Sequence, residues 1–191
     1  MTTTGVHVRL ALPDDLPAVV AINNWAAQHT AANFAIEPET EDMWQQEWRE
    51  THEAFPWLVA LDDAGKVLGF AKGSPWKGRC AYEWTAETTV YIAPDHHGRR
   101  VGTALYGTLI GILRDQGYRT VLGGITQPNP ASVRLHEAMG YRRVALLERV
   151  GWKFDRWHDV GYWELHLQEG DGAPSPIKAV TEVWVARSTE R

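Results

Sequence analysis

Apolar side chains recur along the chain at two spacings, one typical of helices and one typical of strands. Leu16, Val19 and Val20 follow helical spacing, and the polar segment Asp62–Lys66 between two β-prone runs predicts a hairpin. We expect strands at His7–Leu10, Trp57–Leu61, Val67–Ala71, Tyr82–Ile92, Thr120–Ile125, Tyr141–Leu147 and His158–Leu167, and helices from Pro13 to about Thr30, over Glu41–Glu53, from Val101 to near Gly117 and from Asn129 to Gly140.

This mixture of strands and helices predicts an α/β (or α+β) domain in which helices cover a sheet in three layers. The 191 residues suit one such domain, which we place at residues 1–168. Residues 169–191 form a C-terminal extension that we expect to pack over the domain or a partner. Within it, Val180, Val183 and Trp184 look exposed and are apolar enough to need a cover.

Composition and charge narrow the classes of function. Lys and Arg number 19 against 24 Asp and Glu, and the net charge of −5 argues against a general nucleic-acid binder. Neither a bilayer-spanning run nor the layout of a signal peptide is evident. The lone cysteine, Cys80, fits a reducing cytoplasm, where we expect the protein. We expect no metal site, since no second histidine follows His136-Glu137 at zincin spacing.

One junction of strand, loop and helix is the first candidate for chemistry. The loop Ala93–Val101 leads into a helix whose free N–H groups and dipole favour an anion such as pyrophosphate. Gly98 and Gly102 permit close backbone approach, and Arg99 and Arg100 add positive charge. The alternative is a surface turn with a glycine and two solvated arginines, and this segment alone does not decide between them.

The segment Gln127–Tyr141 is the second candidate. Asn129 suits a helix N-cap and Pro130 suits the first helical position. On this helix Ser132 and His136 lie on one face, away from an apolar face, so that the pair could line a site. The alternative is an amphipathic helix whose histidine is merely exposed, and spacing alone favours that alternative.

Together, in this order and separation, the two units resemble the GCN5-related N-acetyltransferase (GNAT) family. Within it, the chain is most similar to phosphinothricin and methionine sulfoximine acetyltransferases. The resemblance runs from about His7 to Leu167 and is spread over many segments, among them Phe55–Ala60, Pro75–Arg79, Ala81–Thr85, Glu87–Tyr91, Ser132–Glu137 and Trp157–Gly161.

The resemblance implies a mixed, twisted sheet of about seven strands, splayed at its centre and flanked by four or so helices, with acetyl-CoA in the gap. It implies that the backbone of Val90–Ile92 meets the pantetheine arm and that the Val90 N–H stabilises the thioester oxygen. The residues implied to bind the coenzyme are Val90, Tyr91, Ile92, His97, Gly98, Arg99, Arg100, Val101, Gly102, Thr103, Ala104, Asn129 and Ser132.

The chain departs from the family pattern at two places. The flanking segments align His97 with the Gln or Arg that usually begins the phosphate loop, and Arg100 with its first glycine. Arg100 could reach a coenzyme phosphate or could crowd the loop. Ala35 stands where the herbicide-detoxifying members carry an arginine, so this chain lacks that cation near the acceptor.

Acetyl transfer requires a neutral amine, for which a carboxylate is a sensible general base. Glu87 matches this role, on the same strand as Val90; the alternative is a solvated strand residue. His136 stands where many relatives carry a tyrosine that acts as the acid. A histidine there could protonate the leaving thiolate, serve as a second base or orient other groups.

The resemblance also implies an acceptor pocket that supplies cations and hydrogen-bond donors, since arginine suits bidentate binding of a carboxylate or phosphinate. Trp84 and Trp157, with Trp76, are expected to wall this pocket. Relatives of this type pair through C-terminal strands, so we expect a homodimer. The residues assigned to acceptor binding are Trp76, Lys77, Arg79, Tyr82 and Thr85.

These inferences predict an acetyl-CoA-dependent N-acetyltransferase for the α-amine of a free amino acid or analogue, of the phosphinothricin or methionine sulfoximine type. Two alternatives stay open: an acetyltransferase for another small amine, and a non-catalytic acyl-CoA-binding module. The expected partners are an amino-acid-like small molecule and a second copy of the chain, with neither nucleic acid nor membrane among them.

Overall fold

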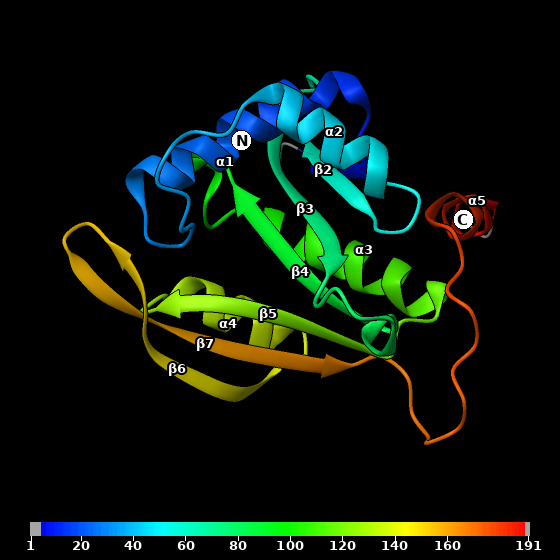
Figure 1. The fold of residues 1–191 in the computed structure, drawn as a ribbon. Helices are drawn as coiled ribbons and strands as arrows, with labels where there is room; N and C mark the ends of the chain where they lie inside the picture. Colours follow the sequence, from blue (N-terminus) through cyan, green and yellow to red (C-terminus); the bar gives the residue numbers. More distant parts are fainter. Residues whose placement is uncertain (1–4, 190–191) are drawn as a thin grey trace.

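The computed structural model describes residues 5–189, and in them the chain forms a seven-stranded sheet with helices on both faces (Figure 1). The order of strands is β1-β2-β3-β4-β5-β7-β6. The strands are β1 (His7–Leu10), β2 (Trp57–Leu61), β3 (Val67–Pro75), β4 (Thr85–Ile92), β5 (Thr120–Gln127), β6 (Arg142–Lys153) and β7 (Arg156–His166), and the helices are α1 (Leu16–His29), α2 (Glu41–Thr51), α3 (Val101–Gln116), α4 (Pro130–Ala138) and α5 (Val180–Thr189). The predicted three-layer α/β class is confirmed.

Alternation along the strands divides the core between the two faces of the sheet. On β2, Leu58 and Ala60 belong to the cluster around α3, whereas Trp57 and Val59 belong to the cluster around α1 and α2. All four side chains are buried. A strand that is apolar at every position is typical of a sheet covered on both sides, which explains why this segment reads as a continuous apolar run.

The sheet parts in its middle, between β4 and β5. These strands pair in parallel, but only over three residues each, from Thr85 opposite Thr120 to Glu87 opposite Leu122. Beyond this point the two strands no longer pair with each other, although β4 continues to Ile92 beside β3 and β5 continues to Gln127 beside β7. The predicted splay at the centre of the sheet is therefore confirmed, and it begins at Glu87.

Several predicted strand bounds are wrong. The strand expected from Tyr82 begins only at Thr85, because Cys80–Tyr82 forms a 3₁₀ turn. β3 continues past the expected end at Ala71 to Pro75. β6 and β7 extend until only two residues separate them, and both of these, Phe154 and Asp155, adopt left-handed φ angles of 52° and 54°. Such a turn matches the twist of a hairpin, but it usually contains glycine or asparagine, and that signal is missing here.

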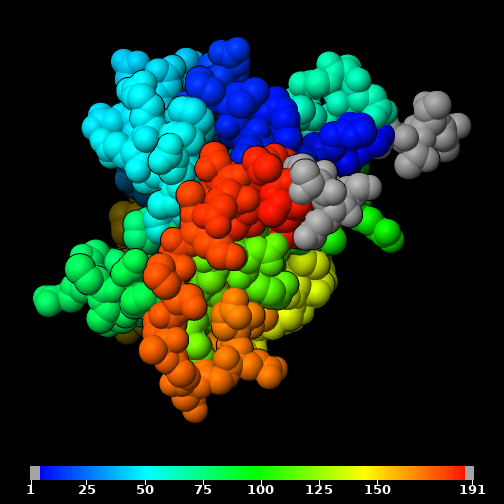
Figure 2. All heavy atoms as spheres, turned by 90° about the vertical axis from the view of Figure 1, so that its right-hand side faces the viewer, coloured from blue at the N-terminus to red at the C-terminus, as the bar shows by residue number. Residues whose placement is uncertain are grey.

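The C-terminal extension packs back onto its own chain. Its helix α5 lies across α3 (Figure 2), and Val180 and Val183 are only 1% and 4% exposed. Trp184 packs against the same core. The expectation that these side chains are exposed and need a partner is therefore wrong for the two valines, because α5 packs back onto its own domain and buries them.

Candidate active site

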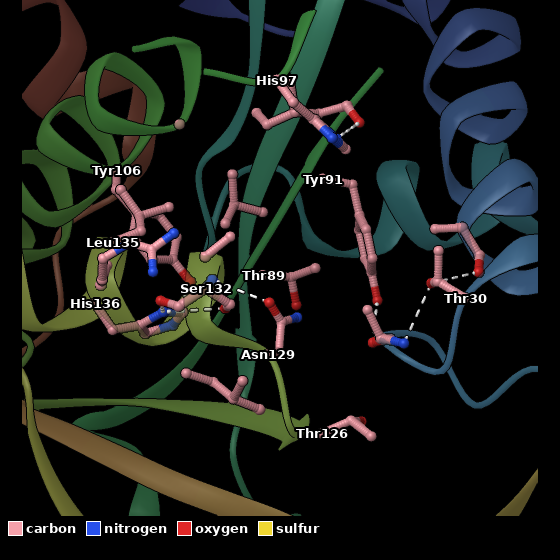
Figure 3. Close-up of a pocket in the computed structure, with 18 of the residues that line it drawn as sticks. Thr30, Thr89, Tyr91, His97, Tyr106, Thr126, Asn129, Ser132, Leu135 and His136 are labelled. Carbon is pink, nitrogen blue, oxygen red and sulfur yellow. Dashed lines mark hydrogen bonds between the residues drawn. The ribbon is translucent and has the colours of Figure 1, made fainter. Parts of the chain in front are cut away.

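A cleft of about 760 Å³ opens where β4 and β5 part (Figure 3). Its walls come from both strands, the N-termini of α3 and α4, the end of α1 with the loop that follows it, and the start of β7. Because β4 and β5 stop pairing with each other, the backbone N–H and C=O groups on their facing edges point into the cleft instead of bonding across it.

The backbone of β4 lines this cleft at alternate residues. The carbonyl of Thr88 lies 3.3 Å from the Tyr106 hydroxyl, and that of Ile92 accepts from His97 Nε2 at 3.1 Å. Both carbonyls thus turn away from β3. In an antiparallel ladder the N–H and C=O of one residue point to the same side and alternate residues share that side. The N–H of Val90, between Thr88 and Ile92, therefore faces the cleft.

The N-terminus of α3 offers the cleft a set of free donors. No side chain caps this helix, and its N-cap residue Arg100 has a left-handed φ of 60°. Gly98 also has a positive φ of 76°, and open space surrounds the position of a Cβ there. The first N–H groups of a helix have no intrahelical acceptor and carry a partial positive charge. Together with the Arg100 side chain, they form a place suited to a pyrophosphate.

Most residues predicted to bind the coenzyme line this one cleft. Arg99 and Ala104 do not. Asn129 also caps α4, since its Oδ1 accepts from Ser132 N at 3.1 Å. Gly102 has a packing role, because a Cβ there would lie 3.0 Å from Leu135 Cδ2. The predicted residues that do line the cleft are Val90, Tyr91, Ile92, His97, Gly98, Arg100, Val101, Gly102, Thr103, Asn129 and Ser132.

Glu87 lies at the last paired position of β4, at the inner end of the cleft. Burial raises the pKa of its carboxyl above the ordinary 4.5, and the positive charge of Lys77 opposes that rise. A Cβ added to Gly124 on β5 would lie 3.5 Å from Glu87 Oε1. A carboxylate whose pKa moves toward neutrality is better matched to accepting a proton at physiological pH.

His136 is 3% exposed, so the alternative that it is merely an exposed helix residue is wrong. Its Nδ1 lies 2.8 Å from the Ser132 carbonyl, which can only accept, so Nδ1 carries the proton. The other nitrogen, Nε2, then accepts from the Tyr106 hydroxyl at 3.0 Å. Burial lowers the pKa of His136 below 6.5, against the effect of the Ser132 hydrogen bond. The imidazole is therefore neutral at pH 7 and forms part of a buried network.

The residues predicted to bind the acceptor gather outside this cleft. Trp76 contacts both Tyr82 and Lys77: the two rings lie 5.2 Å apart, and Lys77 Nζ lies 5.1 Å from the Trp76 ring centre. None of the five predicted residues lines the cleft, nor do Trp84 and Trp157. The indole of Trp84 instead donates to the Ser175 carbonyl in the extension at 2.8 Å. Lys77 alone is linked to the site, through its charge on Glu87.

Sequence reasoning missed several residues that line the cleft. Thr30 and Ala32 come from the loop after α1, and Arg156 and His158 come from β7. Tyr106, which bonds His136, lies on the buried stripe of α3. The helical period could have indicated Tyr106. No local pattern signals the other four, because only the fold brings them to the cleft.

A model of the acetyltransferase (GNAT) family matches residues 19–141. The chain belongs to this family. It is 39% identical over 178 residues to the phosphinothricin N-acetyltransferase of Streptomyces viridochromogenes, covering 93% of this chain and 96% of the relative. It is 35% identical to the L-methionine sulfoximine/L-methionine sulfone acetyltransferase of Pseudomonas aeruginosa, covering 89% and 99%. A phosphinothricin acetyltransferase from Sinorhizobium meliloti, solved with acetyl-CoA, superposes with a TM-score of 0.85 at 30% identity, covering 89% and 93%.

This GNAT protein is an acetyltransferase that uses acetyl-CoA as its co-substrate. The uncapped α3 N-terminus and the open space at Gly98 fit the diphosphate of that molecule. Within residues 5–189 there is no cluster of three or more His, Cys, Asp or Glu suited to a metal ion. No helix in the same range is long and apolar enough to cross a membrane.

Proposed function

We propose that this enzyme acetylates the α-amine of a free amino acid or amino-acid analogue of the phosphinothricin or methionine sulfoximine type. The names of the relatives support this substrate class. The observation that carries the proposal is Glu87, a half-buried carboxylate with a raised pKa, three residues before the Val90 N–H on the same strand.

In the proposed mechanism, the neutral acceptor amine attacks the acetyl carbon of acetyl-CoA, so that an N–C bond forms and the C–S bond breaks. Coenzyme A leaves as a thiolate and is protonated as the nitrogen loses its second proton, which gives the amide and the free thiol. Glu87 removes a proton from the acceptor ammonium, directly or through a water, because only the neutral amine attacks a carbonyl carbon. The Val90 N–H donates to the carbonyl oxygen as negative charge develops on it. His136, whose only ring proton is held by the Ser132 carbonyl, orients the Tyr106 hydroxyl rather than donating to the thiolate itself.

We assign the coenzyme to the predicted set from Val90 to Ser132, with the α3 N-terminus and Arg100 at the diphosphate. For the acceptor we retain Trp76, Lys77, Arg79, Tyr82 and Thr85 as candidates. Support comes from Lys77, which is near enough to Glu87 to affect its pKa. The exposed free thiol of Cys80 fits a reducing compartment, so we propose a cytoplasmic enzyme.

A homodimer is part of this proposal, but through β6 rather than the tail. β6 is an edge strand, and edge strands present unpaired backbone groups to other chains. β6 and the hairpin turn that follows it also expose several large apolar side chains, as interaction sites do. Light scattering should give twice the 21.5 kDa of one chain, and a monomer would refute the dimer. The exposed apolar side chains here are Val144, Leu146, Leu147, Val150, Trp152, Phe154 and Trp157.

The Glu87→Gln variant tests the proposed function. It keeps the shape of the side chain but cannot act as a base, so turnover at pH 7 should fall by roughly 10²–10⁴. The loss should shrink at high pH, where more of the acceptor amine is already neutral. Thiol release from acetyl-CoA, measured across amino acids and their analogues, gives both the rate and the acceptor. Near-native turnover of the variant would refute the role of Glu87.

A further inference from the structure

A buried lysine without a carboxylate partner lies at the end of β6. Lys153 is 5% exposed, and its ammonium donates to the carbonyls of Ala27, Asn33 and Ala35, the last two at 2.6 and 2.9 Å. In the described part of the chain no acidic side chain pairs with it. Burying a charge costs free energy unless its hydrogen bonds are made. Three carbonyls in one place therefore indicate a site built for an ammonium group.

The chemistry of the three acceptors fits lysine. An ammonium group has three donors and no acceptor, so each N–H finds one carbonyl. Ala27 is among the last four residues of α1, whose carbonyls lack helical partners. The C-terminal end of a helix carries partial negative charge and favours a cation. Lys153 thus caps the C-terminus of α1 and also hydrogen-bonds to the loop that follows this helix.

A second contact joins the same two segments. A Cβ on Gly151 would lie 2.4 Å from the ring of Phe34, so the ring rests directly on the glycine. The Phe34 ring also lies 6.0 Å from that of His158, whose Nε2 donates to the Lys153 carbonyl at 3.0 Å. The β6–β7 hairpin therefore contacts the loop after α1 at the Phe34 ring and at the carbonyls of the two adjacent residues, Asn33 and Ala35.

The loop after α1, which the hairpin contacts, forms one wall of the cleft. Thr30 and Ala32 line the cleft, and the Ala32 carbonyl accepts from the Tyr91 hydroxyl at 3.0 Å (Figure 3). Tyr91 and Glu87 lie on the same face of β4, because they are four residues apart. The loop thus covers the face of β4 that carries the proposed base, while Arg156 and His158 on β7 line the opposite side.

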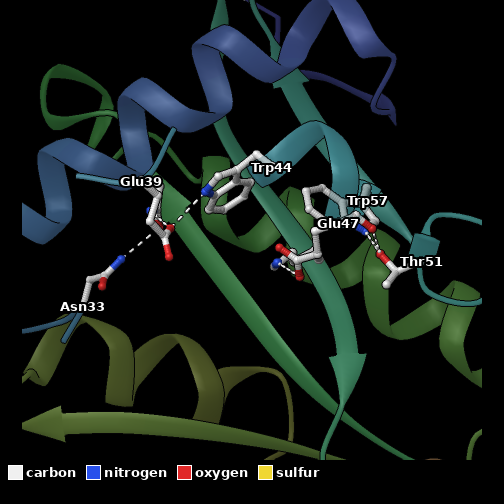
Figure 4. A network of polar contacts seen from close by, with 8 residues as sticks. Asn33, Glu39, Trp44, Glu47, Thr51 and Trp57 are labelled. Carbon is white, nitrogen blue, oxygen red and sulfur yellow. Dashed lines mark hydrogen bonds and ion pairs between the residues drawn. The ribbon is translucent and has the colours of Figure 1, made fainter. Parts of the chain in front are cut away.

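The far end of the loop is fixed separately. Glu39 Oε2 accepts from Asn23 at 2.8 Å and from the Trp44 indole at 2.9 Å, and Asn33 Nδ2 donates to Asn23 Oδ1 at 2.8 Å (Figure 4). These bonds tie the loop to α1 and α2. Of the polar side chains described here, Lys153 alone joins the loop to the β6–β7 hairpin, which lies on the β5 side of the cleft.

We propose that Lys153 is a positioning residue that sets the width of the cleft between the loop after α1 and β7. We call this part the acceptor side of the cleft, because the face of β4 that carries Glu87 opens into it. One wall is the loop after α1, which contacts β4 through Tyr91. The other wall is the start of β7, which pairs with β5. The β4–β5 ladder ends at Glu87 and cannot hold the walls together beyond it. Lys153 spans that opening. This inference rests on the proposed amino-acid acetylation, since it concerns where the acceptor lies.

The Lys153→Met variant removes the three donors but keeps the length of the side chain. The acceptor kcat/KM should fall by about 10- to 100-fold, mainly through KM, as expected when a substrate is misplaced. The KM for acetyl-CoA should change by less than about twofold, because its proposed contacts lie on α3 and α4. Lys153→Arg keeps the charge and should recover part of the loss.

Lys72→Met is the matched control. Lys72 is also largely buried, pairs with Glu47 and lies 4.7 and 4.3 Å from the ring centres of Trp44 and Trp57, away from the cleft. Its removal should lower the melting temperature without raising the acceptor KM. A Lys153→Met enzyme that behaves in the same way, or that raises both KM values equally, would overturn the proposal.

Gly151→Ala keeps the proposal testable if the lysine variant does not fold. The added methyl must push Phe34 away, so the acceptor KM should rise, and Phe34→Ala in the same chain should restore it. An unchanged acceptor KM in Gly151→Ala would count against the proposal. A wild-type enzyme that acetylates no amino acid would refute the proposed function instead, so the two failures are distinguishable.

Discussion

Replacing Gly123 with alanine tests how tightly His136 is held. A Cβ at this position would lie 2.5 Å from His136 Nε2 and 2.8 Å from Cδ2. The ring has little room to yield, because Nδ1 is bonded to Ser132 and the rings of Tyr106 and Tyr141 lie 5.0 and 5.1 Å away. The substitution must therefore displace the imidazole and break its bond to Tyr106.

Overpacking of this kind costs about 1–3 kcal/mol, and a lost hydrogen bond adds about 1 kcal/mol. The free energy of unfolding should thus fall by about 2–4 kcal/mol. For a chain of this length each kcal/mol corresponds to about 2–4 °C, so the melting temperature should drop by about 4–16 °C. Thermal unfolding followed by circular dichroism measures this directly.

Gly124→Ala is the matched control on the other face of β5. Its Cβ would be 3.5 Å from Glu87 Oε1, an ordinary contact, so stability should change little. Adding His136→Ala to Gly123→Ala removes the clash, and the double variant should lose less stability than the two single losses combined. Equal melting temperatures for the Gly123 and Gly124 variants would refute the packing argument.

Three further outcomes are expected. Because the folded-state pKa of His136 lies below 6.5, the unfolded chain binds more protons as the pH falls below 6.5, so stability drops there; urea titrations should find this loss reduced in His136→Asn. Lys77→Met should raise the pKa of Glu87 and move the acidic limb of the kcat profile to higher pH. Val183→Ala, on the face of α5 that packs against the core around α3, should cost about 2 kcal/mol in thermal unfolding without altering either KM.

The parts of the fold that follow local signals could be predicted from the sequence. Asn129 caps α4 as its side chain and the following proline indicate. The hairpin of β6 and β7 could not be bounded, because the left-handed φ angles of Phe154 and Asp155 come from the strands they join rather than from a glycine. The helix α5 did carry a signal, since Val180, Val183 and Trp184 follow helical spacing, but the preceding Pro- and Ser-rich segment obscured it.

The candidate site divides in the same way. Ser132 and His136 share a helix face because they are four residues apart, and the 3.4 Å between Ser132 Oγ and His136 Nδ1 bears this out. The Lys153 contacts join residues separated by 118 to 126 positions. No spacing rule connects a lysine at a strand end with carbonyls so far away, since backbone acceptors leave no trace in the sequence. Such a contact becomes visible only when the loop and the hairpin are placed in space.

Successive side chains of β4 point to opposite faces of the sheet, so the two faces of the site differ in function. Thr88 turns to the α3–α4 face, where its hydroxyl donates to the Leu122 carbonyl and meets the Tyr141 hydroxyl at 3.0 Å. Glu87 and Tyr91 turn to the face covered by the loop after α1. The backbone between them supplies the Val90 N–H. Substitutions on the Thr88 face should therefore act on stability and on His136, whereas those on the Glu87 face should act on the base and on the choice of acceptor.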